Sequence, residues 1–246
     1  MTFDDPNRAN VYYVLARAYR WMGKYQHAIE YFRRAKLLQK RSSSHSCYVY
    51  ANTLADLAVT FSQLNDTTKA LSLHEQAVTL FRRILGANHI DMPLYYTQLA
   101  YVYWQEKRYE NAHTLLLAAL SILKEDLTSN FAGLGLTKHT MGLVKYAMGQ
   151  REEAVRFLQE ALEMRRKSYA DDHPHVARAY YDLALIYMET GNEQVALEYA
   201  QAALTIYQAK VPKTHTELKR SLDLVERLSC QREYMLPYSN FGSVNQ

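Results

Sequence analysis

The sequence predicts an all-α fold, a right-handed α-solenoid of five helix pairs followed by a C-terminal capping helix. Three rows of small residues carry this prediction, because each row recurs every 42 residues along the 246-residue chain. A fixed period of this length is typical of repeats that bury their apolar faces against their neighbours. We expect the rows at close helix contacts, where a larger side chain would be overpacked. Their members are Ala28, Ala70, Ala112, Ala154 and Ala196; Ala35, Ala77, Ala119, Ala161 and Ala203; and Ala16, Ala58, Ala100, Gly142 and Ala184.

Within each period the apolar residues follow two helices separated by a turn. In the first period one helix face is marked by residues three and four positions apart: Tyr12, Leu15, Ala16 and Tyr19. The pattern stops at Gly23 and restarts at Ala28. A helix end favours a residue that accepts a positive φ. Four of the five turn positions hold glycine or asparagine, which meet this need: Gly23, Asn65, Gly149 and Gly191. The fifth, Lys107, is the exception.

The spacing of these residues resembles the tetratricopeptide repeat signature, in which aromatic-x2-Leu-small-x2-Tyr is followed by Ala-x3-Phe. The first repeat carries the signature whole, as Tyr12, Leu15, Ala16, Tyr19, Ala28 and Phe32. The fourth is the most degenerate, with Lys138 and Lys145 at two aromatic positions. The period is longer than the usual repeat of about 34 residues, and in this respect the chain resembles the kinesin-light-chain type.

The resemblance and the phase together set the expected boundaries. A lead-in over residues 1–8 precedes repeats at 9–50, 51–92, 93–134, 135–176 and 177–218, and a disordered tail is predicted over 234–246. A capping helix is predicted over 219–233, within an amphipathic pattern whose inward residues are Leu218, Leu222, Val225 and Leu228. No comparable cap precedes the first repeat, which leaves Val11, Val14 and Trp21 uncovered. Three explanations stay open: a binding surface, self-association through this repeat, or a fragment of a longer array.

Composition and charge exclude several classes of protein. No apolar run approaches the roughly 18–20 residues of a membrane span, so no membrane partner is expected. Two cysteines, Cys47 and Cys230, make a disulfide framework improbable and indicate a cytoplasmic protein. The net charge of +4 is low for a nucleic-acid binder. A basic series recurs near the ends of the second helices, where cations complement the helix dipole: Lys40, Arg82, Lys124 and Arg166.

The motifs of catalytic and cofactor sites are absent from the sequence. There is no HExxH, GxSxG, Walker-type loop or CxxC pair, so we expect no catalytic residues, no cofactor and no enzyme. His173 and His175 adjoin two aspartates, but so short a loop is poorly suited to tetrahedral metal coordination. No metal is therefore expected. One repeat position holds His89, Phe131, His173 and His215, which indicates a structural residue bonded to backbone at a helix start.

The resemblance implies a concave groove lined by the first helices. By phase with the family's groove positions, the candidate peptide-binding residues are Tyr13, Arg17, Arg20, Trp21, Tyr101, Trp104, His139, Tyr146, Arg178 and Tyr181. Aromatic and arginine side chains dominate this set, and both types are enriched in binding hot spots. The sequence therefore predicts a non-catalytic scaffold or adaptor that holds a peptide or helix of a protein partner, one with acidic groups and apolar anchors.

An alternative function is the sensor or regulatory arm of a larger enzyme or regulator. The sequence also departs from the kinesin-light-chain pattern, whose first helices carry an Asn pair before Leu-Ala. Here those places hold Ala55-Asp56, Thr97-Gln98 and Tyr181-Asp182. A motor-cargo role is therefore not carried over from the resemblance.

Overall fold

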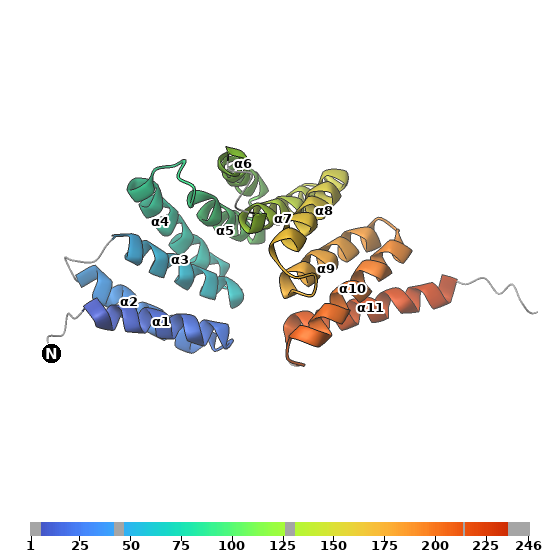
Figure 1. Ribbon diagram of the computed structural model, residues 1–246, viewed down its shortest axis with the longest axis horizontal. Helices are drawn as coiled ribbons and strands as arrows, with labels where there is room; N and C mark the ends of the chain where they lie inside the picture. The colour runs from blue at the N-terminus through green and yellow to red at the C-terminus, as the bar shows by residue number, and fades with distance from the viewer. Residues whose placement is uncertain (1–5, 42–46, 126–130, 214, 236–246) are drawn as a thin grey trace, which may run out of the picture. The chain divides into compact units, whose positions relative to one another are not determined.

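A computed structural model describes residues 6–41, 47–125, 131–213 and 215–235, and every regular element within these ranges is an α-helix (Figure 1). The prediction of an all-α solenoid is confirmed. The predicted tail beyond residue 235 lies outside the described residues. In chain order the helices are α1 (Pro6–Trp21), α2 (Tyr25–Arg41), α3 (Cys47–Gln63), α4 (Thr67–Leu85), α5 (Met92–Gln105), α6 (Tyr109–Glu125), α7 (Phe131–Ala147), α8 (Arg151–Ser168), α9 (Pro174–Glu189), α10 (Glu193–Lys210) and α11 (Thr216–Met235).

The chain forms two compact units, Met1–Gly133 (unit 1) and Leu134–Gln246 (unit 2), with the boundary in the first turn of α7. In unit 1, three helix pairs stack in sequence order, because α2 packs on α3 and α4 packs on α5. In unit 2, α8 packs on α9, α9 pairs with α10, and α11 closes the stack against α10. Each unit therefore repeats one supersecondary element, a pair of helices joined by a tight turn.

The three small rows lie in the packed interior of both units. All fifteen residues are buried, and each of the fourteen alanines is at most 1% exposed. The contact is closest at Gly142, where an added Cβ would lie 2.7 Å from Cγ of Leu158 and 3.2 Å from the carbonyl oxygen of Ala154. The rows mark the lines along which helices approach too closely for larger side chains.

All five turns between paired helices have a residue with positive φ. The φ angle is 71° at Gly23, 58° at Asn65, 80° at Gly149 and 78° at Gly191. Lys107, the residue that did not fit the expected pattern, takes the same conformation with φ of 59°. The backbone hydrogen bonds explain why: the amide of Lys107 donates to Trp104, and the next amide donates to Tyr103 at 2.8 Å. These bonds close the helix end whichever residue occupies the turn.

The recurring loop histidine is a helix-start residue, as its repeat phase predicted. Nδ1 of His89 accepts a hydrogen bond from the amide two residues later at 3.2 Å. His173 does the same at 3.1 Å and His215 at 3.3 Å. Each imidazole thus satisfies an amide that the following helix leaves without a partner.

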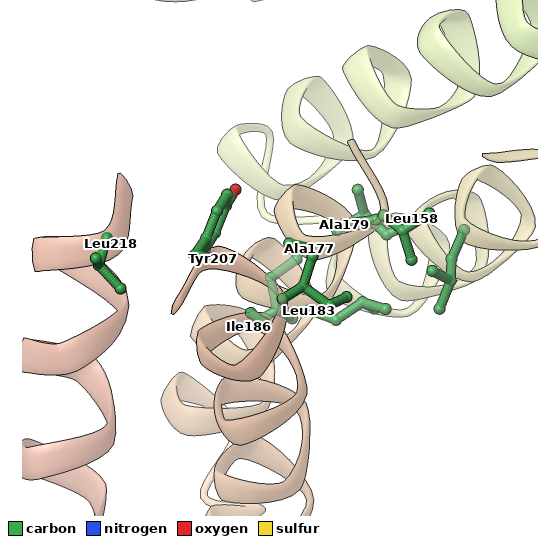
Figure 2. Packing of buried hydrophobic residues seen from close by; sticks show 12 residues of the cluster. Leu158, Ala177, Ala179, Leu183, Ile186, Tyr207 and Leu218 are labelled. Atoms are coloured by element: carbon green, nitrogen blue, oxygen red, sulfur yellow. The ribbon is translucent and has the colours of Figure 1, made fainter. Parts of the chain in front are cut away.

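The core of unit 2 gathers where α8, α9 and α10 meet, and α11 adds Leu218 to it (Figure 2). Further along, α11 buries Leu224 and Leu228 against α10. The expectation that Leu222 points inward is wrong, since this side chain is 38% exposed. The buried residues of α11 run 218, 221, 224 and 228, in steps of three and four that rotate Leu222 away from the contact.

Candidate functional site

The first helices of unit 1, α1, α3 and α5, lie side by side. Hydrogen bonds join residues that are one period and one residue apart on neighbouring helices. The hydroxyl of Tyr95 donates to Oδ1 of Asn52 at 3.2 Å, and Oγ of Ser62 donates to Oε1 of Gln105 at 3.1 Å. Six of the predicted contact residues belong to these helices, and we call them the first-helix face of unit 1: Tyr13, Arg17, Arg20, Trp21, Tyr101 and Trp104.

A single carboxylate, that of Asp56 on α3, fixes two residues of this face. The hydroxyl of Tyr13 donates to Oδ2 of Asp56 at 2.7 Å, and Arg20 contacts Oδ1 at 3.0 Å. Burial and the charge of Asp56 raise the pKa of Tyr13, so its hydroxyl keeps its proton and remains a donor. The charge of Arg20 is already matched inside the protein.

Arg17 differs from Arg20 in both exposure and pairing. Its side chain is exposed, and its guanidinium lies 5.8 Å from the ring centroid of Tyr13. It forms no ion pair within the part of the chain that the structure describes. Arg17 is therefore the arginine of this face whose charge is available to a partner.

The aromatic residues of the face form a separate apolar area on α5. The rings of Tyr101 and Trp104 lie 5.4 Å apart between centroids, and both are partly exposed. Trp21, at the end of α1, is 82% exposed. Large aromatic rings with open surface on one helix array are suitable anchors for a partner.

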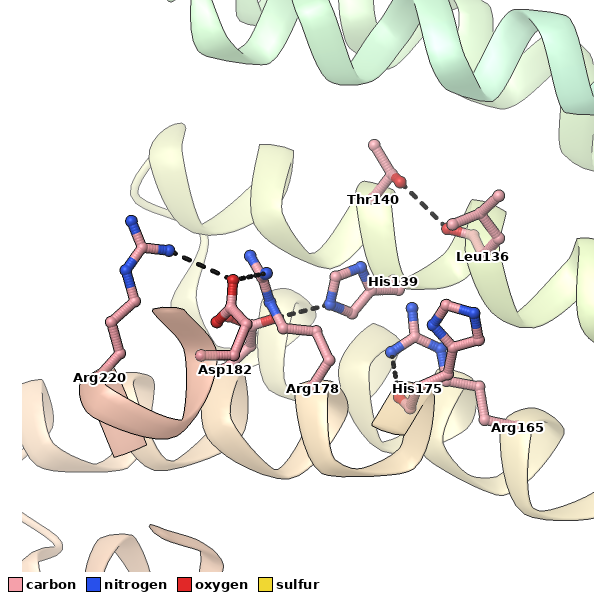
Figure 3. A network of polar contacts seen from close by, with 9 residues as sticks. Leu136, His139, Thr140, Arg165, His175, Arg178, Asp182 and Arg220 are labelled. Atoms are coloured by element: carbon pink, nitrogen blue, oxygen red, sulfur yellow. Dashed lines mark hydrogen bonds and ion pairs between the residues drawn. The ribbon is translucent and has the colours of Figure 1, made fainter. Parts of the chain in front are cut away.

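The predicted residues of unit 2 lie on α7 and α9, and two of them, His139 and Arg178, belong to a polar network (Figure 3). Nε2 of His139 lies 2.6 Å from Oδ2 of Asp182, and Nε of Arg178 donates to the same oxygen at 3.0 Å. Arg178 also reaches Glu217 of α11 at 3.2 Å, and Arg220 contacts the same carboxylate at 3.4 Å. This network joins α7, α9 and α11.

The electrostatics of the network follow from its depth. Burial, together with the nearby charge of Arg165, lowers the pKa of His139 to about 4, so the imidazole is neutral and donates a hydrogen bond from Nε2 to the Asp182 carboxylate. Burial alone would raise the pKa of Asp182, but Arg178 and His139 lower it to about 2. Arg165, whose pKa burial lowers to about 10, donates to the carbonyl oxygen of His175 at 2.8 Å. The network carries charge and ties α7, α9 and α11 together.

The burial of His139 removes it from the residues that a partner can touch. Its side chain is 7% exposed and is engaged with Asp182. The phase with the family's groove positions could not show how deeply this side chain lies. Tyr146 and Tyr181 pack against the core of unit 2 and remain partly exposed.

Two hollows of unit 1 lie away from the predicted residues. One of about 600 Å³ is lined by α4, α5 and α6, with Glu75, Arg82, Tyr103 and Glu110 around it. A smaller one of about 430 Å³ lies between α3 and α4. The sequence did not predict either hollow, although Arg82, which lines the larger one, belongs to the basic series. The described residues contain no cluster of three side chains suited to a metal ion.

Stacked helix pairs with small-residue contacts and positive-φ turns define an α-helical repeat protein. The tetratricopeptide repeat model matches residues 7–83, 67–125 and 134–209, and the chain belongs to the tetratricopeptide repeat family. No described helix has the length and apolar character needed to cross a bilayer.

The chain is similar to several longer proteins. It is 24% identical to the human clustered mitochondria protein homolog over 187 residues, covering 74% of this chain and 14% of the relative. It is 23% identical to KINESIN LIGHT CHAIN-RELATED 3 of Arabidopsis thaliana over 228 residues, covering 91% and 35%. The chain thus spans only about a seventh to a third of these relatives.

Solved structures share the fold. A putative kinesin light chain from Podosopora anserina with TPR-like repeats matches with a TM-score of 0.62 and 24% identity, covering 82% of this chain and 95% of that one. A Rap protein complexed with competence and sporulation factor matches with a TM-score of 0.71 and 15% identity, covering 92% and 66%. The resemblance to the kinesin-light-chain type is confirmed, and family membership supports a protein-interaction scaffold.

Proposed function

We propose that this protein is a non-catalytic scaffold or adaptor that binds an acidic peptide or helix of a protein partner on the first-helix face of unit 1. One observation carries the proposal: the face combines an exposed Arg17, which forms no ion pair among the described residues, with the open aromatic pair Tyr101 and Trp104. Arg20 and Tyr13, held by Asp56, form the rigid base beside Arg17. Preorganised anchors lose less entropy on binding than mobile ones.

The spacing of the helices limits the ligand. Neighbouring packed helices lie roughly 8–10 Å apart, which puts α1 and α5 roughly 20 Å from each other. An extended peptide covers this distance in roughly six residues at about 3.3 Å each. The proposed ligand therefore carries a carboxylate for Arg17 and an apolar side chain for Tyr101 and Trp104, about six residues apart.

Unit 2 offers a weaker surface in this proposal. Arg178 is bound to Asp182 and Glu217, so its charge is largely compensated. Tyr146 and Tyr181 keep part of their rings open and would add apolar contact only. The proposed location is the cytoplasm, which fits the free, exposed thiols of Cys47 and Cys230.

A displayed octapeptide library, panned on the whole protein, tests the proposal. Selected peptides should carry Asp or Glu about six residues from an aromatic or aliphatic residue. Arg17→Ala and Trp104→Ala should each weaken binding about thirtyfold, the effect of losing a hot spot of about 2 kcal/mol. The loss at Arg17 should shrink as salt rises, whereas the loss at Trp104 should not.

Two controls decide between surfaces. Arg83→Ala removes an exposed arginine of α4 and should leave binding unchanged. Simultaneous change of the basic series Lys40, Arg82, Lys124 and Arg166 to Gln should also leave it unchanged. If this variant loses binding while Arg17→Ala and Trp104→Ala do not, the first-helix face is the wrong surface.

The alternative function is a sensor or regulatory arm of a larger enzyme or regulator. It is supported by the small fraction of each relative's length that the chain covers. Sequencing the full-length transcript tests it. A transcript that encodes a catalytic domain in the same reading frame would favour the arm. A transcript that encodes only these 246 residues would reject it in this form.

A further inference from the structure

The side of α1 that faces away from α2 and α3 is apolar and open. Val11 is 55% exposed, Val14 57% and Leu15 38%. These three residues, which we call the α1 outer face, lie within five positions of one another on one side of the helix. Single exposed apolar residues are ordinary, but a contiguous group of them marks a surface that is covered in use.

The repeats show what covers such a face. The residues in phase with Val11 and Leu15 are buried in the second, third and fifth repeats, where each is at most 7% exposed; they are Thr53, Tyr95 and Ala179, and Leu57, Leu99 and Leu183. In those repeats the second helix of the preceding repeat packs on the first helix, as α2 on α3, α4 on α5 and α8 on α9. The ring of Phe81 on α4, for example, stacks on Tyr95 at 3.6 Å between centroids.

The occupant therefore has a defined chemistry. We infer that the α1 outer face is a docking surface for an amphipathic helix of a partner protein, similar to the second helix of a tetratricopeptide repeat. Its apolar stripe would carry residues equivalent to Val78 and Phe81, three positions apart. The position of Val14 holds Asp56 and Asp182 in later repeats, so at α1 this position carries no carboxylate, and the exposed Arg8 lies one turn before Val11.

A folded second copy of the chain is a poor source of this helix. The second helices α2, α4, α8 and α10 are already packed against α3, α5, α9 and α11. The closing helix α11 turns charged side chains outward, all of them exposed: Lys219, Asp223, Glu226 and Arg227. These four second helices are thus occupied, and the outward side of α11 is mostly charged apart from Leu222, which favours a different protein as the partner.

A graft into the whole chain tests whether the face accepts such a helix. Residues 67–91, comprising α4 and the loop after it, are placed directly before Arg8. Each grafted residue then lies two periods of 42 residues before its native copy. The grafted Phe81 should therefore pack on Val11 in the way that the native Phe81 stacks on Tyr95. The amides of α1 should exchange with deuterium at least about tenfold more slowly, since exchange reports local opening.

The matched control carries the same graft with Val78→Ser and Phe81→Ser. This variant should leave exchange in α1 at the wild-type rate. Equal protection by both grafts, or by neither, would overturn the assignment of the face as an acceptor of a second helix.

A photo-crosslinking amino acid at position 14, in cells that make the protein, tests the source of the helix. The expected product is a peptide of another polypeptide whose sequence has an amphipathic helical pattern. Crosslinks to a second copy or to residues of the same polypeptide would overturn the choice of partner. So would a crosslinking yield no higher than that of a control at position 33 on α2. Val14→Glu should abolish the crosslinked partner and leave octapeptide binding intact, which separates this inference from the proposed function.

Discussion

The two units hold a carboxylate at the same repeat position in two different ways. Asp56 and Asp182 are three periods apart, and each receives a hydrogen bond from the residue 43 positions earlier and a second contact from an arginine. The side chain of Asp56 is 21% exposed, while that of Asp182 is 6% exposed. The same repeat position therefore holds a partly exposed carboxylate in unit 1 and a buried one in unit 2.

The donors explain the difference in role. At Asp56 a tyrosine hydroxyl and an arginine leave the neighbouring Arg17 open to solvent. At Asp182 the donor is a buried neutral imidazole, and Arg178 continues the network to Glu217 on α11. Repeat phase fixes where the carboxylate lies, and its burial and its donors decide whether it orders a surface or an interior.

The largest effect should come from deleting the buried carboxylate. Asp182→Ala leaves Arg178 without its inner partner and His139 without its acceptor, which should cost unit 2 about 3–5 kcal/mol. Asp56→Ala breaks a partly exposed pair and should cost about 1 kcal/mol or less.

Urea denaturation can follow the two units separately. Both tryptophans, Trp21 and Trp104, lie in unit 1, so their fluorescence reports unit 1 while circular dichroism reports the whole chain. Asp182→Ala should shift only the dichroism transition. Equal losses for the two aspartate variants would show that depth of burial does not distinguish the sites.

A fall in pH should destabilise each unit through one buried histidine. Burial lowers the pKa of His74 in unit 1 and of His139 in unit 2 to about 4. An unfolded histidine binds its proton near pH 6.5, so the unfolded state is favoured as the pH falls from about 6.5 to about 4. Each unit should lose about 2–3 kcal/mol over this window and be most stable above it.

The histidine substitutions separate the two sites. His74 is buried without an ion pair or side-chain hydrogen bond among the described residues, so His74→Leu should be nearly neutral at pH 7 and remove the pH dependence of tryptophan fluorescence. His139→Leu removes one of the two donors to the buried Asp182 and should cost about 2 kcal/mol at pH 7. A similar loss for both variants would mean that His139 contributes packing and no specific bond.

A smaller effect should come from the closest helix contact. Ala100 in unit 1 and Gly142 in unit 2 occupy the same repeat position. The side chain of Leu158 fills the space that a methyl group at position 142 would occupy. Gly142→Ala gains about 1 kcal/mol of helix propensity, but the new methyl group pushes Leu158 and the α8 backbone away from α7. We expect a net loss of about 1 kcal/mol in thermal unfolding of unit 2, and a more stable variant would show that α7 and α8 can separate freely.

The sequence predicted most of the fold and less of the site. The phased alanines and turn residues defined the helix pairs, because close helix contact and positive φ leave a direct record in residue type. The depth of His139 left no such record, since its neighbours Asp182 and Arg165 are remote in sequence. Leu222 was misplaced because its helix joins α10 through a different face than simple spacing indicated. The pairing of Arg20 with Asp56 depends on side-chain geometry that repeat phase does not encode.

The smallest effect concerns the turns, where the units also differ. Unit 2 has Gly149 and Gly191 at its positive-φ positions, while unit 1 has Asn65 and Lys107 at two of its three. A residue with a side chain pays about 1–2 kcal/mol for the left-handed conformation. Glycine avoids this cost but loses more chain entropy on folding. Lys107→Gly should therefore stabilise unit 1 by about 0.5 kcal/mol, measured from the midpoint of tryptophan fluorescence in urea.

The mirror substitution is Gly149→Lys in unit 2. No atom lies within 4 Å of the site where its Cβ would stand, so any loss comes from the backbone conformation alone. This variant should lose about 1 kcal/mol in the dichroism transition. Lys107→Ala keeps the Cβ and removes the charge, and it should give no gain. If it matches Lys107→Gly, the cost at this turn lies in the lysine charge or stem and not in the left-handed backbone.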